Sequence, residues 1–361
     1  MRRRLPGLVL VAATLAAAVA VVPALSGASA PSGPSPSIAS PSYSRAYHPV
    51  KGIAVDLSQA SKLTDRQAMA IGVQLFSMIS QRFHANAVSL NFPFFQSGSN
   101  ANDPERSSMT PSPERLAALT AIAHRFHLAV QYRPYLYEGN LRGKSRPSIT
   151  PSDPNLWFSN YWLFLEPYLE SADEAGASGF SVAVELTSLM GRLPQWTVLV
   201  QKAKTVYGGK LYYSEQHDPQ ASLPLTARGY DAYQPIHLGS PKLVSAARFT
   251  KGFERNFKLA GMQATPEDLT IEELGIAAVS GAYNEPNFFR YSKTTKLDRA
   301  VQTDWFQGAC NAFWALHMQG IFYWSIDFNT FTPGENSRLS IYNWLQTPTA
   351  SVITRCFERT H

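Results

Sequence analysis

The stretch Gly52-Ile53-Ala54-Val55-Asp56-Leu57, followed by Ser58-Gln59-Ala60, decides between the two folds that this chain permits. The first six residues form a short apolar run of the kind that becomes a buried strand. In a doubly wound open sheet, the first strand leads into a Gly-rich loop that binds phosphate, and no glycine follows this run. The stretch therefore favours a closed parallel barrel.

Seven further β-rich runs continue this pattern, with longer helical patterns between them. The strand candidates are Gly52–Leu57, Ala87–Phe92, Ala129–Tyr135, Gly179–Leu186, Lys210–Ser214, Ala227–Tyr233, Leu269–Leu274 and Gly320–Ile326. The helical candidates include Asp65–Phe83, Ser112–Phe126, Trp157–Ala175, Gln195–Tyr207, Ser240–Ala260 and Asp298–Met318. This alternation predicts an α/β fold with a single (β/α)8 TIM barrel. A doubly wound open sheet is the alternative.

The composition fits one large folded region. The chain has 361 residues, of which 45% are hydrophobic and 16% charged, so it can bury a sizeable core. Arg2, Arg3 and Arg4 supply half of the formal net charge of +6, and no later run of Lys or Arg appears. We therefore expect no nucleic-acid partner.

The N-terminal residues have the layout of a secretory signal peptide. Arg2-Arg3-Arg4 precede an apolar run over 8–22, and small residues follow over 26–30. We expect a signal peptide over 1–28, cleaved near Ala28 to Ala30, a Pro/Ser-rich linker over 29–50 and the folded domain over 51–361. The protein is then secreted or otherwise extracytoplasmic, without stable membrane insertion. An uncleaved membrane anchor is the alternative, although the apolar run is slightly short for one.

The chain has two cysteines, Cys310 and Cys356. An exported chain meets an oxidising compartment, where an even pair of cysteines favours a disulfide bond. Two separate buried thiols are the alternative.

Polar and aromatic residues recur where the predicted strands end. In a (β/α)8 barrel, functional side chains lie at these ends and in the loops that follow. Together the residues resemble a sugar site, with aromatic faces for pyranose rings and acids for the acetal. They are Asp56, Asn91, Arg133, Tyr135, Glu185, Glu215, Gln216, His217, Asp218, Asp231, Tyr233, Glu272, Glu273, Trp324 and Asp327.

Glu185 is the strongest single candidate. Phe180, Val182 and Val184 share one face of its predicted strand. Glu185 shares the other face with the small residues Ser181 and Ala183. If the bulky face packs on helices, Glu185 points into the barrel mouth, where partial burial keeps it protonated as a general acid. A solvated glutamate at the start of a loop is the alternative.

Alternation does not choose between Glu272 and Glu273. Neighbouring residues on a regular strand point to opposite faces. We therefore expect one of them to be the nucleophile and the other to be a supporting or helix-facing residue.

Several of these strands resemble those of glycoside hydrolase family 113 and its clan A relatives. The similar segments are Val182-Ala183-Val184-Glu185-Leu186-Thr187-Ser188-Leu189 with Trp196, Gly229-Tyr230-Asp231-Ala232-Tyr233-Gln234-Pro235, Ile271-Glu272-Glu273-Leu274-Gly275 and Tyr323-Trp324-Ser325-Ile326-Asp327, with Tyr212 to Asp218 and, more loosely, Arg133-Pro134-Tyr135. The resemblance implies that Glu273 is the nucleophile, Glu185 the acid/base and Trp324 the floor of a sugar subsite. Alternation allows only one of Tyr323 and Trp324 to face inward.

The resemblance implies retaining hydrolysis of a polysaccharide or cell-envelope glycan, and such pairs hold their carboxyl groups about 5 Å apart. A positive neighbour keeps the nucleophile ionised, and Arg133 is the candidate for this role. Tyr233 is the candidate for orienting Glu273. The substrate-binding candidates are Asp56, Asn91, Arg133, Tyr135, Gln216, His217, Asp231, Tyr233, Trp324 and Asp327.

The chain departs from the family pattern at the substrate subsite. Val184 stands where an Asn usually precedes the acid/base, Gln216-His217 replace Asn-Trp, and Ile276 replaces a Tyr. Mannan specificity is therefore not carried over. A catalytically silent glycan-binding barrel and a transglycosylase remain the alternatives.

We expect a monomer that needs no cofactor and no metal. His124 and His127 have i, i+3 spacing, but they lie at the end of a predicted helix on the opposite rim, without an acid or a cysteine near them in sequence.

Overall fold

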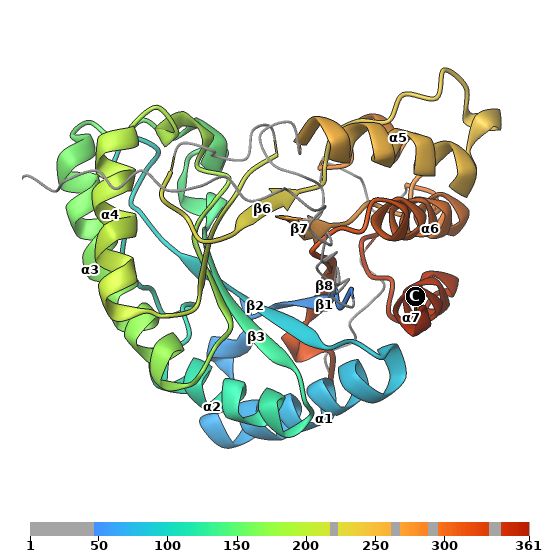
Figure 1. Ribbon diagram of the computed structural model, residues 1–361. Helices are drawn as coiled ribbons and strands as arrows, with labels where there is room; N and C mark the ends of the chain where they lie inside the picture. The colour runs from blue at the N-terminus through green and yellow to red at the C-terminus, as the bar shows by residue number, and fades with distance from the viewer. Residues whose placement is uncertain (1–46, 217–222, 261–267, 288–294, 332–340, 361) are drawn as a thin grey trace, which may run out of the picture. The chain divides into compact units, whose positions relative to one another are not determined.

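The computed structural model describes residues 47–216, 223–260, 268–287, 295–331 and 341–360 (Figure 1). Its parallel strands follow the order β5-β4-β3-β2-β1-β8-β7-β6. The strands are β1 (Val50–Asp56), β2 (Ala87–Phe94), β3 (Ala129–Leu136), β4 (Gly179–Val184), β5 (Lys210–Ser214), β6 (Arg228–Asp231), β7 (Leu269–Leu274) and β8 (Gly320–Asp327). Each agrees with a predicted run. The predicted signal peptide and most of the predicted linker lie outside the described residues.

Backbone hydrogen bonds join the two edges of the sheet, β5 and β6. Ala227 N donates to Leu211 O and Asp231 N donates to Glu215 O, each over 3.1 Å. A doubly wound sheet keeps its edge strands apart. The predicted (β/α)8 barrel is therefore confirmed, and the doubly wound alternative is wrong.

Helices surround the barrel (Figure 1). They are α1 (Asp65–Phe83), α2 (Pro113–Arg125), α3 (Pro154–Glu174), α4 (Leu193–Val206), α5 (Ala246–Ala260), α6 (Arg299–Ala315) and α7 (Pro348–Glu358). Local chemistry sets their starts: the Thr64 hydroxyl accepts from Gln67 N before α1, and the Ser112 hydroxyl accepts from Arg115 N before α2. The sequence predicts α1 to α6, whereas α7 is not among the predicted helices. None of the described helices has the length and apolar character needed to cross a bilayer.

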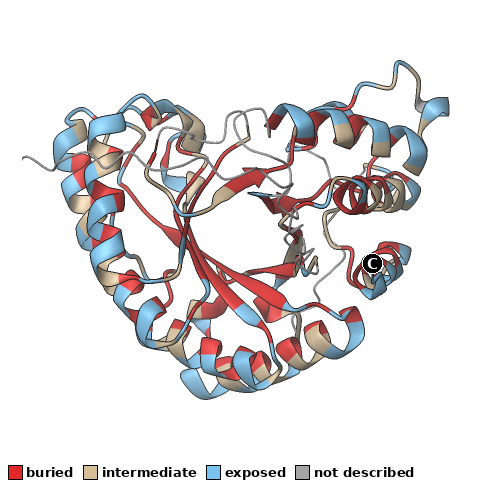
Figure 2. Ribbon diagram, in the orientation of Figure 1, coloured by how far each residue is buried: buried red, intermediate tan, exposed pale blue. Residues whose placement is uncertain are grey.

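Alternation along the strands separates an apolar outer layer from a polar interior. The strands are buried almost throughout, and the exposed residues lie mainly on the outer faces of the helices (Figure 2). On β3, Tyr132 faces outward, and its hydroxyl lies 2.9 Å from Thr120 Oγ1 of α2. Gln131 Nε2 instead donates to Ser181 Oγ of β4 across 3.1 Å inside the barrel. The functional side chains thus rest on a hydrogen-bonded interior.

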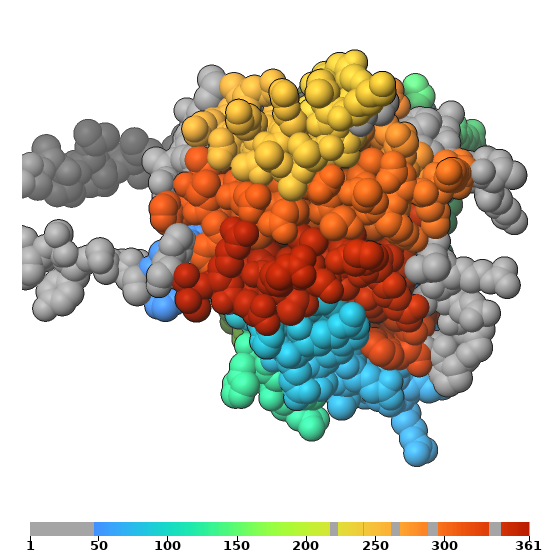
Figure 3. Space-filling model, turned by 90° about the vertical axis from the view of Figure 1, so that its right-hand side faces the viewer, coloured from blue at the N-terminus to red at the C-terminus, as the bar shows by residue number. Residues whose placement is uncertain are grey.

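The last helix completes the outer layer. Figure 3 shows α5, α6, α7 and α1 as successive bands, with α7 between α6 and α1. Cys310 of α6 and Cys356 of α7 form a disulfide bond whose Cα atoms are 5.9 Å apart. The predicted disulfide is therefore present, and the alternative of two separate thiols is wrong.

Candidate active site

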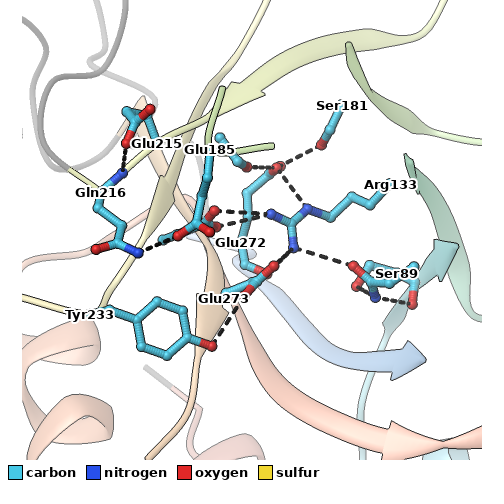
Figure 4. A network of polar contacts seen from close by, with 12 residues as sticks. Ser89, Arg133, Ser181, Glu185, Glu215, Gln216, Tyr233, Glu272 and Glu273 are labelled. Carbon is cyan, nitrogen blue, oxygen red and sulfur yellow. Dashed lines mark hydrogen bonds and ion pairs between the residues drawn. The ribbon is translucent and has the colours of Figure 1, made fainter. Parts of the chain in front are cut away.

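Arg133 is the centre of the candidate site (Figure 4). Its side chain is fully buried and points inward from β3, as Gln131 does two residues earlier. Nη1 donates to Glu273 Oε1 over 2.7 Å, and Nη2 donates to both Asp231 oxygens over 3.0 and 3.3 Å. Its Nε lies 3.4 Å from Glu272 Oε2. One guanidinium therefore faces three carboxylates.

Glu273 is held at both of its carboxylate oxygens. Arg133 binds Oε1, and the Tyr233 hydroxyl donates to Oε2 over 3.1 Å. Its side chain is 10% exposed, whereas the Arg133 side chain is completely buried. The two predicted contacts of Glu273, an ion pair with Arg133 and a hydrogen bond from Tyr233, are both present.

A register irregularity lets Glu272 and Glu273 reach the same arginine. Tyr230 of β6 pairs with Ile271 of β7, but the next residue, Asp231, pairs with Glu273. The extra residue breaks the strict alternation of the strand. Of the two positions expected for the second glutamate, Glu272 takes the supporting one beside Arg133, and the helix-facing one is wrong. Glu272 faces the buried interior, and Glu273 lies nearer the mouth.

Glu185 follows directly after β4 and lies in a strained backbone conformation. Its φ is 51°, which non-glycine residues rarely adopt. Its N–H donates to Ser214 O over 2.9 Å, and Gln216 Nε2 donates to Oε1. Its side chain is 12% exposed, so the alternative of a solvated glutamate does not describe it.

The environment of Glu185 favours its protonated form. Burial, with a contribution from the negative charge of Glu273, raises the pKa of Glu185 to about 7. Arg146 opposes this shift from 3.9 Å. Glu273 is instead bound directly by a guanidinium. The two glutamates thus have the unlike surroundings that separate an acid from a nucleophile.

Asp56 and Tyr135 form another part of the mouth. The Tyr135 hydroxyl donates to Asp56 Oδ1 over 3.3 Å, and Ser58 N donates to the same oxygen over 2.9 Å. Burial, together with Asp327, raises the pKa of Asp56 to about 6. Asp327 pairs with Asp56 in register at the end of β8 and is exposed.

Asn91 and Asp231, which were expected at the rim of the barrel, lie buried inside it. Both are buried, and both accept hydrogen bonds from Arg133, Asn91 at Oδ1 over 3.3 Å. Burial raises the pKa of Asp231 well above its ordinary value, although Arg133 opposes the shift. Both residues therefore bind the Arg133 guanidinium inside the barrel.

Trp324 and Tyr323 take opposite sides of β8. Tyr323 is fully buried against Phe306 of α6 and Phe357 of α7. Trp324 is half-buried, and its side chain borders Gly275, where the Tyr233 hydroxyl also lies. Trp324 therefore lies close to the residue that binds Glu273, and Tyr323 belongs to the helix layer.

The sequence predictions do not include Arg146, and they name Glu215 only among the strand-end residues. Arg146 lies between β3 and α3, contacts Glu138 and Glu185, and lies over the Tyr135 ring. Glu215 is buried and accepts from Thr187 Oγ1 and Gln216 N. Arg146 follows ten residues after β3 ends, so its place in the sequence gives no signal. Glu215 directly follows β5 and stood among the strand-end residues, but not among the site candidates.

His217, a predicted substrate-binding residue, lies outside the described residues. Within the parts of the chain that the structure describes, no group of three or more His, Cys, Asp or Glu side chains is arranged to hold a metal ion.

Comparisons with known proteins agree with this architecture. Residues 70–343 match the model of Glycoside Hydrolase Family 113. No curated protein sequence matches the chain. A solved GH113 β-1,4-mannanase superposes with a TM-score of 0.70 at 17% identity, covering 86% of this chain and 99% of that one.

Two further structures share the fold. The GH113 β-mannanase AaManA from Alicyclobacillus acidocaldarius, in complex with ManMIm, gives a TM-score of 0.67 at 17% identity, covering 85% of this chain and 96% of that one. GH5_18 from Streptomyces cattleya, in complex with Manβ1-4GlcNAc, gives 0.57 at 12% identity, covering 86% and 81%.

The family match extends from α1 to the segment before α7, so it includes the strands that carry Arg133, Glu185 and Glu273. The chain belongs to glycoside hydrolase family 113 and is a glycosidase built on a (β/α)8 barrel.

Proposed function

We propose that this protein is an exported, retaining glycoside hydrolase that cleaves a polysaccharide or a cell-envelope glycan, with Glu273 as nucleophile and Glu185 as acid/base. The observation that carries the proposal is the contrast between the two carboxyl groups. Arg133 and Tyr233 hold Glu273, whereas burial raises the pKa of Glu185 to about 7.

In the first step, a Glu273 oxygen attacks the anomeric carbon and the glycosidic C–O bond breaks. Glu185 gives its proton to the leaving oxygen, and the sugar becomes an ester of Glu273. Arg133 and Tyr233 orient the attacking carboxylate.

In the second step, water attacks the anomeric carbon, Glu185 takes the proton of the water, and the ester bond to Glu273 breaks. The charge of Glu273 helps to raise the pKa of Glu185. Esterification removes this charge, which lowers the pKa of Glu185. The acid of the first step thereby becomes the base of the second.

The remaining mouth residues are proposed to bind the sugar. Trp324 would lie against the apolar face of a pyranose ring. Asp56, Tyr135 and Asp327 would bind hydroxyl groups, and Gln216 would contact the substrate beside Glu185. His217 is proposed for the same subsite from its place after β5.

Export rests on the N-terminal sequence and is consistent with the Cys310–Cys356 disulfide. We propose cleavage of residues 1–28, a linker over 29–50 and a monomeric catalytic domain over 51–361. Intact mass and N-terminal sequencing of the secreted protein, with gel filtration, test these points.

The test of activity uses 2-deoxy-2-fluoro aryl glycosides together with a panel of glycans that begins with β-mannosides. β-Mannosides come first because the compared structures include β-mannanases. A retaining hydrolase forms a trapped ester on Glu273, found by peptide mass spectrometry, and releases sugar with retained configuration. A silent binding barrel stays unlabelled, whereas a transglycosylase is labelled but yields longer glycans.

A further inference from the structure

Glu272 is a buried carboxylate that the proposed reaction does not use. It is completely buried, and hydrogen-bond donors from three other strands converge on it (Figure 4). Gln131 Nε2 of β3 donates to Oε1, and Ser181 Oγ of β4 donates to Oε2 over 2.7 Å. Ser214 Oγ of β5 also donates to Oε2. Glu272 thus links four strands across the inside of the barrel.

Burial of a carboxylate costs free energy unless its oxygens are well paired. An apolar side chain would fill a barrel interior without this cost. Because Glu272 has no access to solvent, it cannot touch a substrate at the mouth. Any role of Glu272 in the reaction must therefore act through the residues that it contacts.

Glu272 contacts Arg133 through both its side chain and its backbone. The Glu272 carboxylate lies 3.4 Å from Arg133 Nε, and its backbone carbonyl accepts from Arg133 Nη1 over 3.3 Å. Arg133 Nε makes no hydrogen bond within the described structure, so this carboxylate is the charge that faces that edge of the guanidinium. A guanidinium is rigid and planar, so a restraint on the Nε edge sets the direction of both Nη groups.

We propose that Glu272 is a positioning residue, which holds Arg133 so that Nη1 stays on Glu273 Oε1 and Nη2 stays on Asp231. The extra residue on β7 makes this possible, because it turns both neighbouring glutamates toward one arginine. This inference rests on the proposed role of Glu273 as nucleophile.

The test is Glu272→Gln, which keeps the shape but places an amide donor among groups that already donate. We expect kcat to fall about 10- to 100-fold with KM nearly unchanged, and fluorosugar labelling of Glu273 to slow equally. Thr270→Val is the matched control, since Thr270 is buried on the same strand and its hydroxyl is not among the groups that donate to the Glu272 carboxylate.

An unchanged kcat and an unchanged rate of labelling in Glu272→Gln, beside an active wild type, overturn the inference. A wild type that neither turns over nor becomes labelled overturns the proposed function instead. Where Glu272→Gln does not fold, Ser181→Ala with Ser214→Ala replaces it, because both remove donors to Glu272 without touching Arg133. A several-fold lower kcat in that variant supports the inference, and a wild-type kcat overturns it.

Discussion

Arg133 Nη1 donates to Glu273 Oε1 across 2.7 Å, although 140 residues separate the two positions in the chain. Both lie inside the barrel, where the guanidinium also binds Asp231. A buried ion pair of this kind orients the carboxylate and neutralises part of a cluster that carries an excess of acids. Arg133 is therefore expected to matter for both stability and chemistry.

Replacement of Arg133 should separate these two contributions. Arg133→Met leaves buried carboxylates without a counter-charge and should lower the free energy of unfolding by about 3–5 kcal/mol. Arg133→Lys keeps the charge but loses the fork geometry, so it should be more stable than Arg133→Met and still hydrolyse poorly. Urea unfolding and kcat/KM measure the two effects. Equal stability of both variants would contradict this account.

The two glutamates that we propose as acid/base and nucleophile should differ in their response to the leaving group. Glu185→Gln should lower hydrolysis of natural glycosides by about 10²- to 10⁴-fold. Glycosylation by aryl glycosides with good leaving groups should continue, since these need no protonation. Glu273→Gln should lose both reactions. Stopped-flow release of the aryl group gives the comparison, and near-native activity of Glu273→Gln would refute the assignment.

Arg146 should set the pH at which activity declines. The proposed first step needs a protonated Glu185, whose pKa is raised to about 7, so kcat/KM should be high below pH 7 and fall as the pH rises through this value. Arg146 favours the ionised form of Glu185. Arg146→Gln should therefore move the basic limb to higher pH. Arg142→Gln, an exposed change in the same loop, is the control and should leave the profile unchanged.

Trp324 and Tyr323 provide a matched pair on β8. If the sugar stacks on Trp324 as proposed, Trp324→Ala should lower kcat/KM by about 100-fold while Tm changes little. Binding of a glycan should quench tryptophan fluorescence in the wild type and much less in this variant. Tyr323→Ala should instead lower Tm and leave the kcat of the folded protein nearly normal. The reverse pattern would assign Trp324 to the core.

The disulfide should stabilise the outer layer. Cys310 and Cys356 are 46 positions apart, and a loop of this size predicts roughly 4 kcal/mol of stabilisation in the chain-entropy model. Cys310→Ser with Cys356→Ser should lower Tm, whereas kcat/KM should hold because the bond lies between α6 and α7. Two alkylatable thiols in the native protein would contradict the bond.

The sequence by itself determined the barrel, the disulfide candidates and most of the candidate site. The β-rich runs and helical patterns repeat along the chain, and regular hydrogen bonding makes such periods readable from residue types. Glu185 contacts Arg146 and Gln216 and is largely buried, although β4 shifts register between Ser181 and Ala183 and simple alternation does not hold along the whole strand. Arg133 and Tyr233 follow from the rule that the ends of parallel strands converge.

The tertiary structure alone decided what depends on irregular backbone and on distant partners. One extra residue on β7 turns Glu272 and Glu273 toward Arg133. No residue type in the sequence indicates this irregularity. Arg146 contacts Glu185 because of the path of its loop, which no periodic pattern in the sequence predicts. Asn91 and Asp231 stand at strand ends, but their depth follows from packing around the guanidinium. Sequence patterns report local geometry, whereas contacts across the barrel exist only once the sheet has closed.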